Sequence, residues 1–86
     1  MHRVTDRFRK CLEKLPRSVQ AIAKRNFELL KENPSHPSLH FKKVGKFWSA
    51  RVGLHHRALA VPDGEHFTWV WLGTHGEYED MIKRTR

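Results

Sequence analysis

Residues 48–61 read WSARVGLHHRALAV, and this stretch decides the fold. Its first five residues alternate with period 2 and its last four form an apolar run after Arg57, and both patterns are typical of β-strands. Between them, residues 53–55 have the length and the glycine of a three-residue hairpin loop. The stretch therefore predicts a hairpin in which Arg51 faces Arg57, whereas a two-residue loop would place Ala58 opposite Arg51.

Two further segments carry strand signals. Residues 39–42 alternate with period 2, and residues 67–72, FTWVWL, are apolar on both parities. A run of that second kind predicts a central strand that is buried on both faces. Residues 62–65, PDGE, have the composition of a turn. Four short runs joined by tight turns predict a four-stranded antiparallel meander.

Two amphipathic helices are predicted before the strands, one on each side of Pro16. Thr5 or Asp6 is placed to cap the first helix. Pro16 opens the second, which ends near Glu32 because the residue before Pro34 is pushed out of the α region. The apolar stripes are Phe8, Cys11, Leu12 and Leu15 in the first helix and Val19, Ile22, Ala23, Phe27 and Leu30 in the second.

Helices followed by strands predict an α+β fold in a single domain spanning residues 1–86. An N-terminal helical hairpin covers one face of the four-stranded antiparallel meander sheet. The pattern leaves room for a short C-terminal helix around residues 78–83.

The chain is strongly basic. Its 86 residues include 17 Lys and Arg against 9 Asp and Glu, a formal net charge of +8. Such a field attracts polyanions, and nucleic acid, an acidic protein and a membrane surface all fit it. The apolar helix faces are better explained by packing on the sheet, and no apolar run approaches the length that spans a bilayer.

The single cysteine and the N-terminus both point to the cytoplasm. Cys11 excludes an internal disulfide and lies on a helical apolar stripe, so we interpret it as a core residue. Residues 1–6 have no apolar signal region behind their charge, so secretion is not indicated.

Arg51 and Arg57 are the first candidate site residues. Two guanidinium groups directly opposed on one sheet face repel each other unless an anion lies between them. Arginine holds phosphate in a planar, two-bond fork, so the pair predicts a phosphate clamp. The alternative is that both side chains lie over aromatic residues and end in water.

Three lysines and a histidine extend the basic surface. Lys42, Lys43 and Lys46 are placed to bind backbone phosphates, or to protect an edge strand from pairing with other chains. His75 lies in LGTHGEY, residues 72–78, where the strand leaves the sheet. An imidazole is the usual general acid or base for breaking an RNA phosphodiester, and Tyr78 is close enough to assist; the alternative is a surface or capping histidine.

Two other residue classes lead to weaker hypotheses. The seven histidines lack the spacing of metal ligands, so neither a metal nor another cofactor is expected. Tryptophan can stack on unpaired bases. We interpret Trp69 and Trp71 as core residues and leave both readings open for Trp48.

With these residues placed, the chain resembles the RelE/ParE toxin superfamily of type II toxin–antitoxin (plasmid stabilisation) systems. The similarity rests on the order and spacing of residues 15–20, 33–39, 48–53, 56–59 and 73–78. It implies the helical hairpin on an antiparallel sheet. Family members often begin with a β-strand, but the four residues before Thr5 are too few for one, so four strands remain the expectation.

The resemblance also implies site roles. Arg57 resembles the sheet arginine that stabilises the scissile phosphate, and Arg51 resembles a supporting basic residue. His75 falls where YoeB-like members place a histidine, and the three lysines lie in the lysine-bearing region of RelE. Gly76 stands where YoeB-like toxins have a tyrosine, so Tyr78 is two places further on.

Three functions follow as hypotheses. The first is an mRNA-cleaving endoribonuclease (an mRNA interferase) that acts on translating ribosomes in the cytoplasm, without a cofactor, and is masked by a cognate antitoxin. The second is a ParE-like inhibitor of DNA gyrase without catalysis. The third is a non-catalytic RNA- or DNA-binding module.

Overall fold

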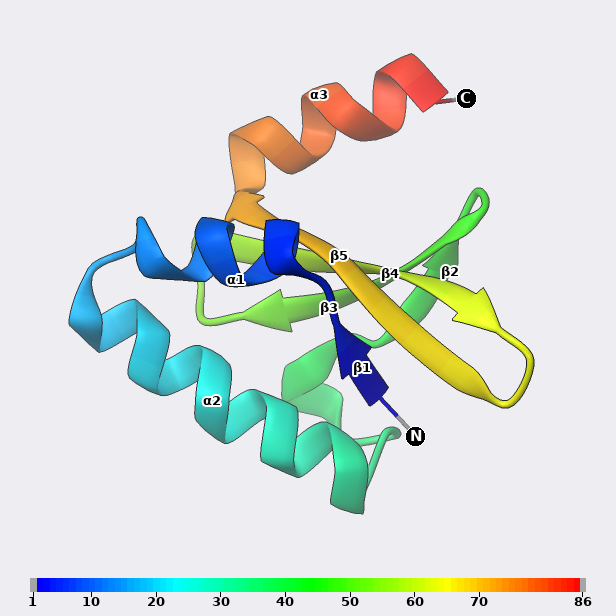
Figure 1. Cartoon of the computed structure of the whole chain (residues 1–86), viewed down its shortest axis with the longest axis horizontal. Coiled ribbons are helices and arrows are strands. Elements are labelled where there is room, and N and C mark those ends of the chain that lie inside the picture. Colours follow the sequence, from blue (N-terminus) through cyan, green and yellow to red (C-terminus); the bar gives the residue numbers. More distant parts are fainter. Residues whose placement is uncertain (1, 86) are drawn as a thin grey trace.

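A computed structural model describes residues 2–85 and arranges them as three α-helices and one five-stranded sheet (Figure 1). The sheet order is β1-β5-β4-β3-β2. The strands are β1 (His2–Val4), β2 (Lys42–Val44), β3 (Phe47–Val52), β4 (His56–Asp63) and β5 (His66–Thr74). The helices are α1 (Asp6–Glu13), α2 (Arg17–Glu32) and α3 (His75–Thr85), with a 3₁₀ turn, η1, at Pro37–Leu39.

The fifth strand corrects the predicted four-stranded sheet. The antiparallel meander β2-β3-β4-β5 is confirmed, but β1 runs parallel to β5 and pairs Val4 with Trp69. Three residues suffice because the next residue anchors them: Thr5 donates from both its backbone N–H and its hydroxyl to the carbonyl of Trp69, at 3.1 and 3.0 Å. Of the two cap candidates in the sequence, Thr5 is the one that caps α1, by accepting from the N–H of Phe8.

The first strand of the meander begins later than predicted. Pro37–Leu39 forms the 3₁₀ turn η1, and β2 starts only at Lys42. Leu39 is buried at 1% exposure in the larger core. His40 then ends the turn with a left-handed backbone (φ 44°), so residues 39–42 are not a continuous strand.

The central hairpin forms as predicted. The loop between β3 and β4 contains Gly53 at φ 66°, a conformation that favours glycine. Arg51 stands directly opposite Arg57 in the register. The prediction that a three-residue loop sets Arg51 opposite Arg57 is therefore confirmed.

Helices cover both faces of the sheet, which makes three layers (Figure 1). α1 and α2 pack on one face, where Trp69 lies at the centre of the larger core. α3 is longer than predicted and packs on the other face, where Tyr78 and Ile82 contact Leu59 and Trp71.

A bulge in β5 separates the two tryptophans. Leu59 of β4 pairs with Trp71 while the next residue, Ala60, pairs with Trp69, so Val70 is an extra residue in β5. Without it, Trp69 and Trp71 would share a face; with it, they fill different cores. Both tryptophans are buried core residues, as predicted, and Trp48 packs on Phe41 with ring centroids 4.9 Å apart.

Within residues 2–85, no helix is both long and apolar enough to cross a membrane. Cys11 is partly buried and packs against both cores, in agreement with its predicted place on the apolar stripe.

Candidate functional site

A polar hollow of about 240 Å³ opens on the α3 face of the sheet, between α3 and the strands β2, β3 and β4. It brings together four of the seven predicted site residues, which come from three different elements. Its lining consists of His40, Lys42, Val44, Ser49, Arg57, His75, Tyr78, Glu79 and Ile82.

Arg57 lies on the central strand of the sheet. Its side chain is partly buried, and one terminal nitrogen donates to the carbonyl of His56 at 3.1 Å. Within residues 2–85, Arg57 forms no ion pair with an Asp or Glu side chain, so its charge is not neutralised in that way. A fixed guanidinium without a counterion suits the binding of an anion.

Arg51 faces Arg57 in the register but does not line the hollow. Its Nε donates to the carbonyl of Gly53 at 2.9 Å, and its Nη1 lies 3.4 Å from Nε2 of His40, which does line it. The guanidinium is thus held at the rim by the hairpin loop. Arg51 adds positive charge there, at a point set by its contacts with Gly53 and His40.

His75 is the first residue of α3, and one backbone hydrogen bond and one side-chain contact position it. Its N–H donates to the carbonyl of His55 at 2.7 Å, which joins the start of α3 to the hairpin loop. Its Nε2 lies 3.2 Å from a carboxylate oxygen of Glu79, one turn further along the helix. The imidazole also lies beside the ring of Tyr78, with centroids 6.0 Å apart.

A capping box holds this end of α3 in place. The hydroxyl of Thr74 accepts from the N–H of Glu77, and the Glu77 carboxylate accepts from the N–H and hydroxyl of Thr74 at 2.9 and 3.0 Å. These hydrogen bonds from Thr74 lower the pKa of Glu77 below its ordinary value. The carboxylate is therefore engaged in positioning the helix that carries His75.

The predicted lysines divide between two places. Lys42 lines the hollow, while Lys43 and Lys46 lie outside it. Strand alternation turns Lys43 away from Lys42, and the ammonium of Lys46 lies 5.6 Å from the ring centre of Phe47. Only Lys42 is thus placed beside Arg57 and His75.

Three polar lining residues were not predicted as site residues from the sequence. Ser49 is a buried polar residue at 2% exposure, and its position two residues before Arg51 on the same face was an available signal. His40 and Glu79 had no such signal, because one depends on the left-handed turn and the other on the length of α3.

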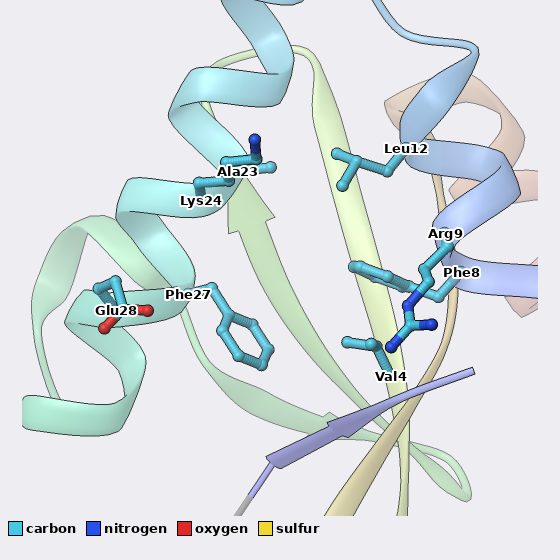
Figure 2. A pocket seen from close by; sticks show the side chains of 8 residues that line it. All are labelled: Val4, Phe8, Arg9, Leu12, Ala23, Lys24, Phe27 and Glu28. Carbon is cyan, nitrogen blue, oxygen red and sulfur yellow. The ribbon is translucent and has the colours of Figure 1, made fainter. Parts of the chain in front are cut away.

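A second, apolar groove of about 230 Å³ lies between α1 and α2. Figure 2 shows Phe8 and Leu12 of α1 pointing into the gap from one side and Phe27 from the other, with Val4 of β1 at one end. Three charged residues, Arg9, Lys24 and Glu28, lie along its edges. This groove holds none of the predicted site residues.

Within residues 2–85, no group of three or more His, Cys, Asp or Glu side chains is placed to hold a metal ion.

His56, the residue beside Arg57, has its pKa lowered by burial and by the nearby His55. It faces Val52 in the register, on the α1–α2 side of the sheet and away from the hollow.

Comparison with known proteins places the fold. No family model matches the sequence, and no curated protein matches it significantly. Among solved structures, the RelB–RelE antitoxin–toxin complex from Methanococcus jannaschii matches with a TM-score of 0.72 and 18% identity, covering 92% of this chain and 96% of that one.

Two further solved structures have a similar fold. The toxin–antitoxin complex RelBE2 from Mycobacterium tuberculosis matches with a TM-score of 0.63 and 24% identity, over 86% of this chain and 95% of the other. A copper-bound mutant toxin from Helicobacter pylori matches with a TM-score of 0.56 and 21% identity, over 88% and 94%.

The chain is thus a small, basic α+β protein whose fold matches these toxin–antitoxin structures. Its particular fold is that of the RelE toxins, and the resemblance seen in the sequence is confirmed at the level of the fold.

Proposed function

We propose that this chain is the toxin of a toxin–antitoxin system and that it cleaves mRNA on translating ribosomes in the cytoplasm. The observation that carries the proposal is the polar hollow, in which Arg57 and His75 meet on a RelE-type fold. A fixed cation beside a proton carrier is the pair of groups that phosphodiester cleavage needs.

The reaction follows from the chemistry of RNA. The ribose 2′-oxygen attacks the adjacent phosphorus, the bond from phosphorus to the 5′-oxygen breaks, and a 2′,3′-cyclic phosphate forms. One proton leaves the 2′-hydroxyl and one is delivered to the departing 5′-oxygen. His75 carries a proton in this exchange as general acid or base.

Arg57 stabilises the transition state, and Lys42 in the same hollow binds the RNA backbone. Negative charge builds up on the non-bridging phosphate oxygens as the fifth bond to phosphorus forms. The unpaired guanidinium of Arg57 is fixed in the wall of the hollow and needs no rearrangement to meet that charge. Arg51 supplies further positive charge from the rim, and Tyr78 supports the imidazole of His75.

An antitoxin is the partner we propose for this toxin, since two of the similar structures are toxin–antitoxin complexes. The apolar groove between α1 and α2 supports this part of the proposal. Its walls are mostly apolar and open to solvent, with Phe8 and Phe27 pointing into it (Figure 2). An amphipathic segment of an antitoxin would bury this surface.

The test is expression of the protein without an antitoxin. We expect translation arrest and cut transcripts.

In purified form, Arg57→Ala is expected to lower the rate of mRNA cleavage about 100-fold or more through loss of charge stabilisation. His75→Ala is expected to lower it by at least about 100-fold through loss of proton transfer.

Matched controls separate the site from general effects. Arg25→Ala and His36→Ala remove the same residue types outside the hollow and are expected to leave cleavage and growth arrest unchanged. Full cleavage by both site variants would contradict the assigned chemistry.

The same expression experiment distinguishes the two alternative functions. DNA damage and filamentation with intact transcripts would identify a gyrase inhibitor, and salt-sensitive binding without toxicity would identify a non-catalytic binding module.

A further inference from the structure

A third hollow, of about 380 Å³, lies between α1 and the start of α3, away from the residues assigned to cleavage. Its rim comes from one exposed side of α1, and its floor comes from the end of β5. The lining residues are Arg7, Lys10, Cys11, Lys14, Trp71, Leu72 and Glu77.

The rim carries three positive charges at regular spacing. Arg7, Lys10 and Lys14 follow one another at i, i+3 and i+7, so they share one side of α1 and its C-cap, Lys14. All three are exposed, and no ion pair is recorded for any of them within residues 2–85. By contrast, Arg9 on the neighbouring side of α1 lies 3.9 Å from Asp6.

One acidic residue, Glu77, lines this hollow against three cations, so a surplus of positive charge remains. The Glu77 carboxylate accepts two hydrogen bonds from Thr74 and is thereby held at the cap of α3. Three cations are thus left facing solvent around a concave surface. That arrangement attracts a polyanion whose charges are spaced along a chain.

The apolar floor of this hollow indicates which class of polyanion fits it best. Trp71 is 8% exposed and, together with the partly buried Cys11, gives the hollow a small apolar floor between the cations, whereas Leu72 is 2% exposed and adds little to it. Single-stranded RNA offers phosphates for the rim and unpaired bases and riboses for such a floor. An acidic peptide offers the charges without the flat apolar groups, so RNA is the better fit.

The position of the hollow connects it to the proposed cleavage site. Glu77 lines this hollow, while His75 and Tyr78, from the same first turns of α3, line the polar hollow. The two hollows therefore flank one end of α3, and a helix with its side chains is about 10–12 Å across. A single strand held at Arg57 can continue over this end of α3 to α1.

We propose that the hollow formed by Arg7, Lys10, Lys14 and Trp71 is a second RNA-binding surface, which holds single-stranded RNA flanking the segment at the cleavage site. The proposal rests on the proposed function for the identity of the nucleic acid. It adds a contact that supplies affinity without taking part in the chemistry.

The test measures binding separately from cleavage. The probe is a 12-nucleotide oligouridylate in which every ribose is 2′-O-methylated, so that no 2′-hydroxyl is available for cleavage. Binding is measured between 50 and 300 mM salt. For the triple variant Arg7→Gln, Lys10→Gln, Lys14→Gln we expect the slope of log affinity against log salt to become shallower by about 2, since each phosphate contact to a single strand contributes about 0.7.

A charge-matched control uses α2. Arg17, Lys24 and Arg25 are exposed and no ion pair is recorded for them within residues 2–85, so their triple Gln variant removes the same net charge elsewhere. Its slope is expected to stay near that of the parent chain. Equal loss of slope in both triple variants would overturn the proposal, because general charge would then account for binding.

Two further outcomes are decisive. An unchanged slope in the α1 variant, with binding of polyglutamate lost instead, would overturn the proposal in favour of an acidic protein partner. If the parent protein cleaves no mRNA but the slope of log affinity against log salt still becomes shallower in the α1 variant, the second RNA-binding surface would be upheld and the proposed nuclease rejected. Failure of the further proposal can therefore be told apart from failure of the proposed function.

Discussion

At the scale of single residues, Gly73 illustrates how closely β5 and α3 approach each other. A Cβ atom at this position would stand 2.7 Å from Cη2 of Trp71 and 2.9 Å from the Glu77 carboxylate. The indole of Trp71 is buried in the core beneath α3 and cannot move away freely. Glycine is therefore required here by space, and its φ is not in the left-handed region.

Gly73→Ala is accordingly expected to lower the free energy of unfolding by about 1–3 kcal/mol, the usual cost of forcing an extra carbon into a packed core. Urea denaturation measures the change. Gly76→Ala is the matched control, because no atom lies within 4 Å of a Cβ there and alanine favours the helical backbone. A Gly73→Ala variant as stable as the Gly76→Ala variant would show that the indole yields without cost.

At the scale of elements, α3 connects the sheet to the proposed cleavage site. The capping box of Thr74 and Glu77 fixes the helix start, and the backbone bond from His75 to His55 ties that start to the hairpin loop. The position of the imidazole is thus set by the element that carries it. Loss of the Thr74–Glu77 hydrogen bonds should therefore disturb the position of the His75 side chain, although His75 itself is unchanged.

Glu77→Ala removes the acceptor for the N–H and hydroxyl of Thr74 and is expected to cost about 1 kcal/mol of folding stability, as for other helix caps. Amide hydrogen exchange at residues 75–77 should become faster, and the rate of mRNA cleavage should fall. Glu77→Gln keeps an acceptor oxygen and should retain most of the protection. Unchanged amide exchange in the Ala variant would contradict this role of the cap.

The pH dependence of this cap has a definite sign. Because the pKa of Glu77 is lowered in the folded chain from its ordinary 4.5, its contribution is present above that value. It is lost as the pH falls through the lower pKa of the folded state.

At the scale of the whole molecule, two histidines link folding to pH in a higher range. His2 in β1 accepts a hydrogen bond from the indole N–H of Trp69 at 3.0 Å, and burial, as the largest cause, lowers its pKa. Burial also lowers the pKa of His56. The unfolded chain therefore binds more protons than the folded chain near and below pH 6.5.

We expect the free energy of unfolding to be fully retained above about pH 7 and to decrease as the pH falls below 6.5 through the folded-state pKa values of His2 and His56. Chemical denaturation at pH 7.5 and pH 5.5 measures the difference. His2→Asn offers an acceptor that does not titrate, so its decrease should be smaller. A decrease of the same size in parent and variant would exclude His2 as a cause.

Much of the chain was predictable from local patterns. The helical spacing of apolar residues indicated α1 and α2, and the end of α2 at Glu32 follows from the Asn33-Pro34 step. The three-residue loop at Gly53 set Arg51 opposite Arg57. These features depend on residues a few positions apart, whose energetics a sequence displays directly.

Tertiary structure alone decided the rest. The pairing of β1 with β5 joins residues about 65 positions apart, the bulge at Val70 places Trp69 and Trp71 in different cores, and the turn at His40 displaces β2. The meeting of Arg57 and His75 in one hollow also depends on contacts between distant segments. Local pattern determines which elements form and in what register a tight hairpin closes, whereas packing between distant elements decides which side chains share a cavity.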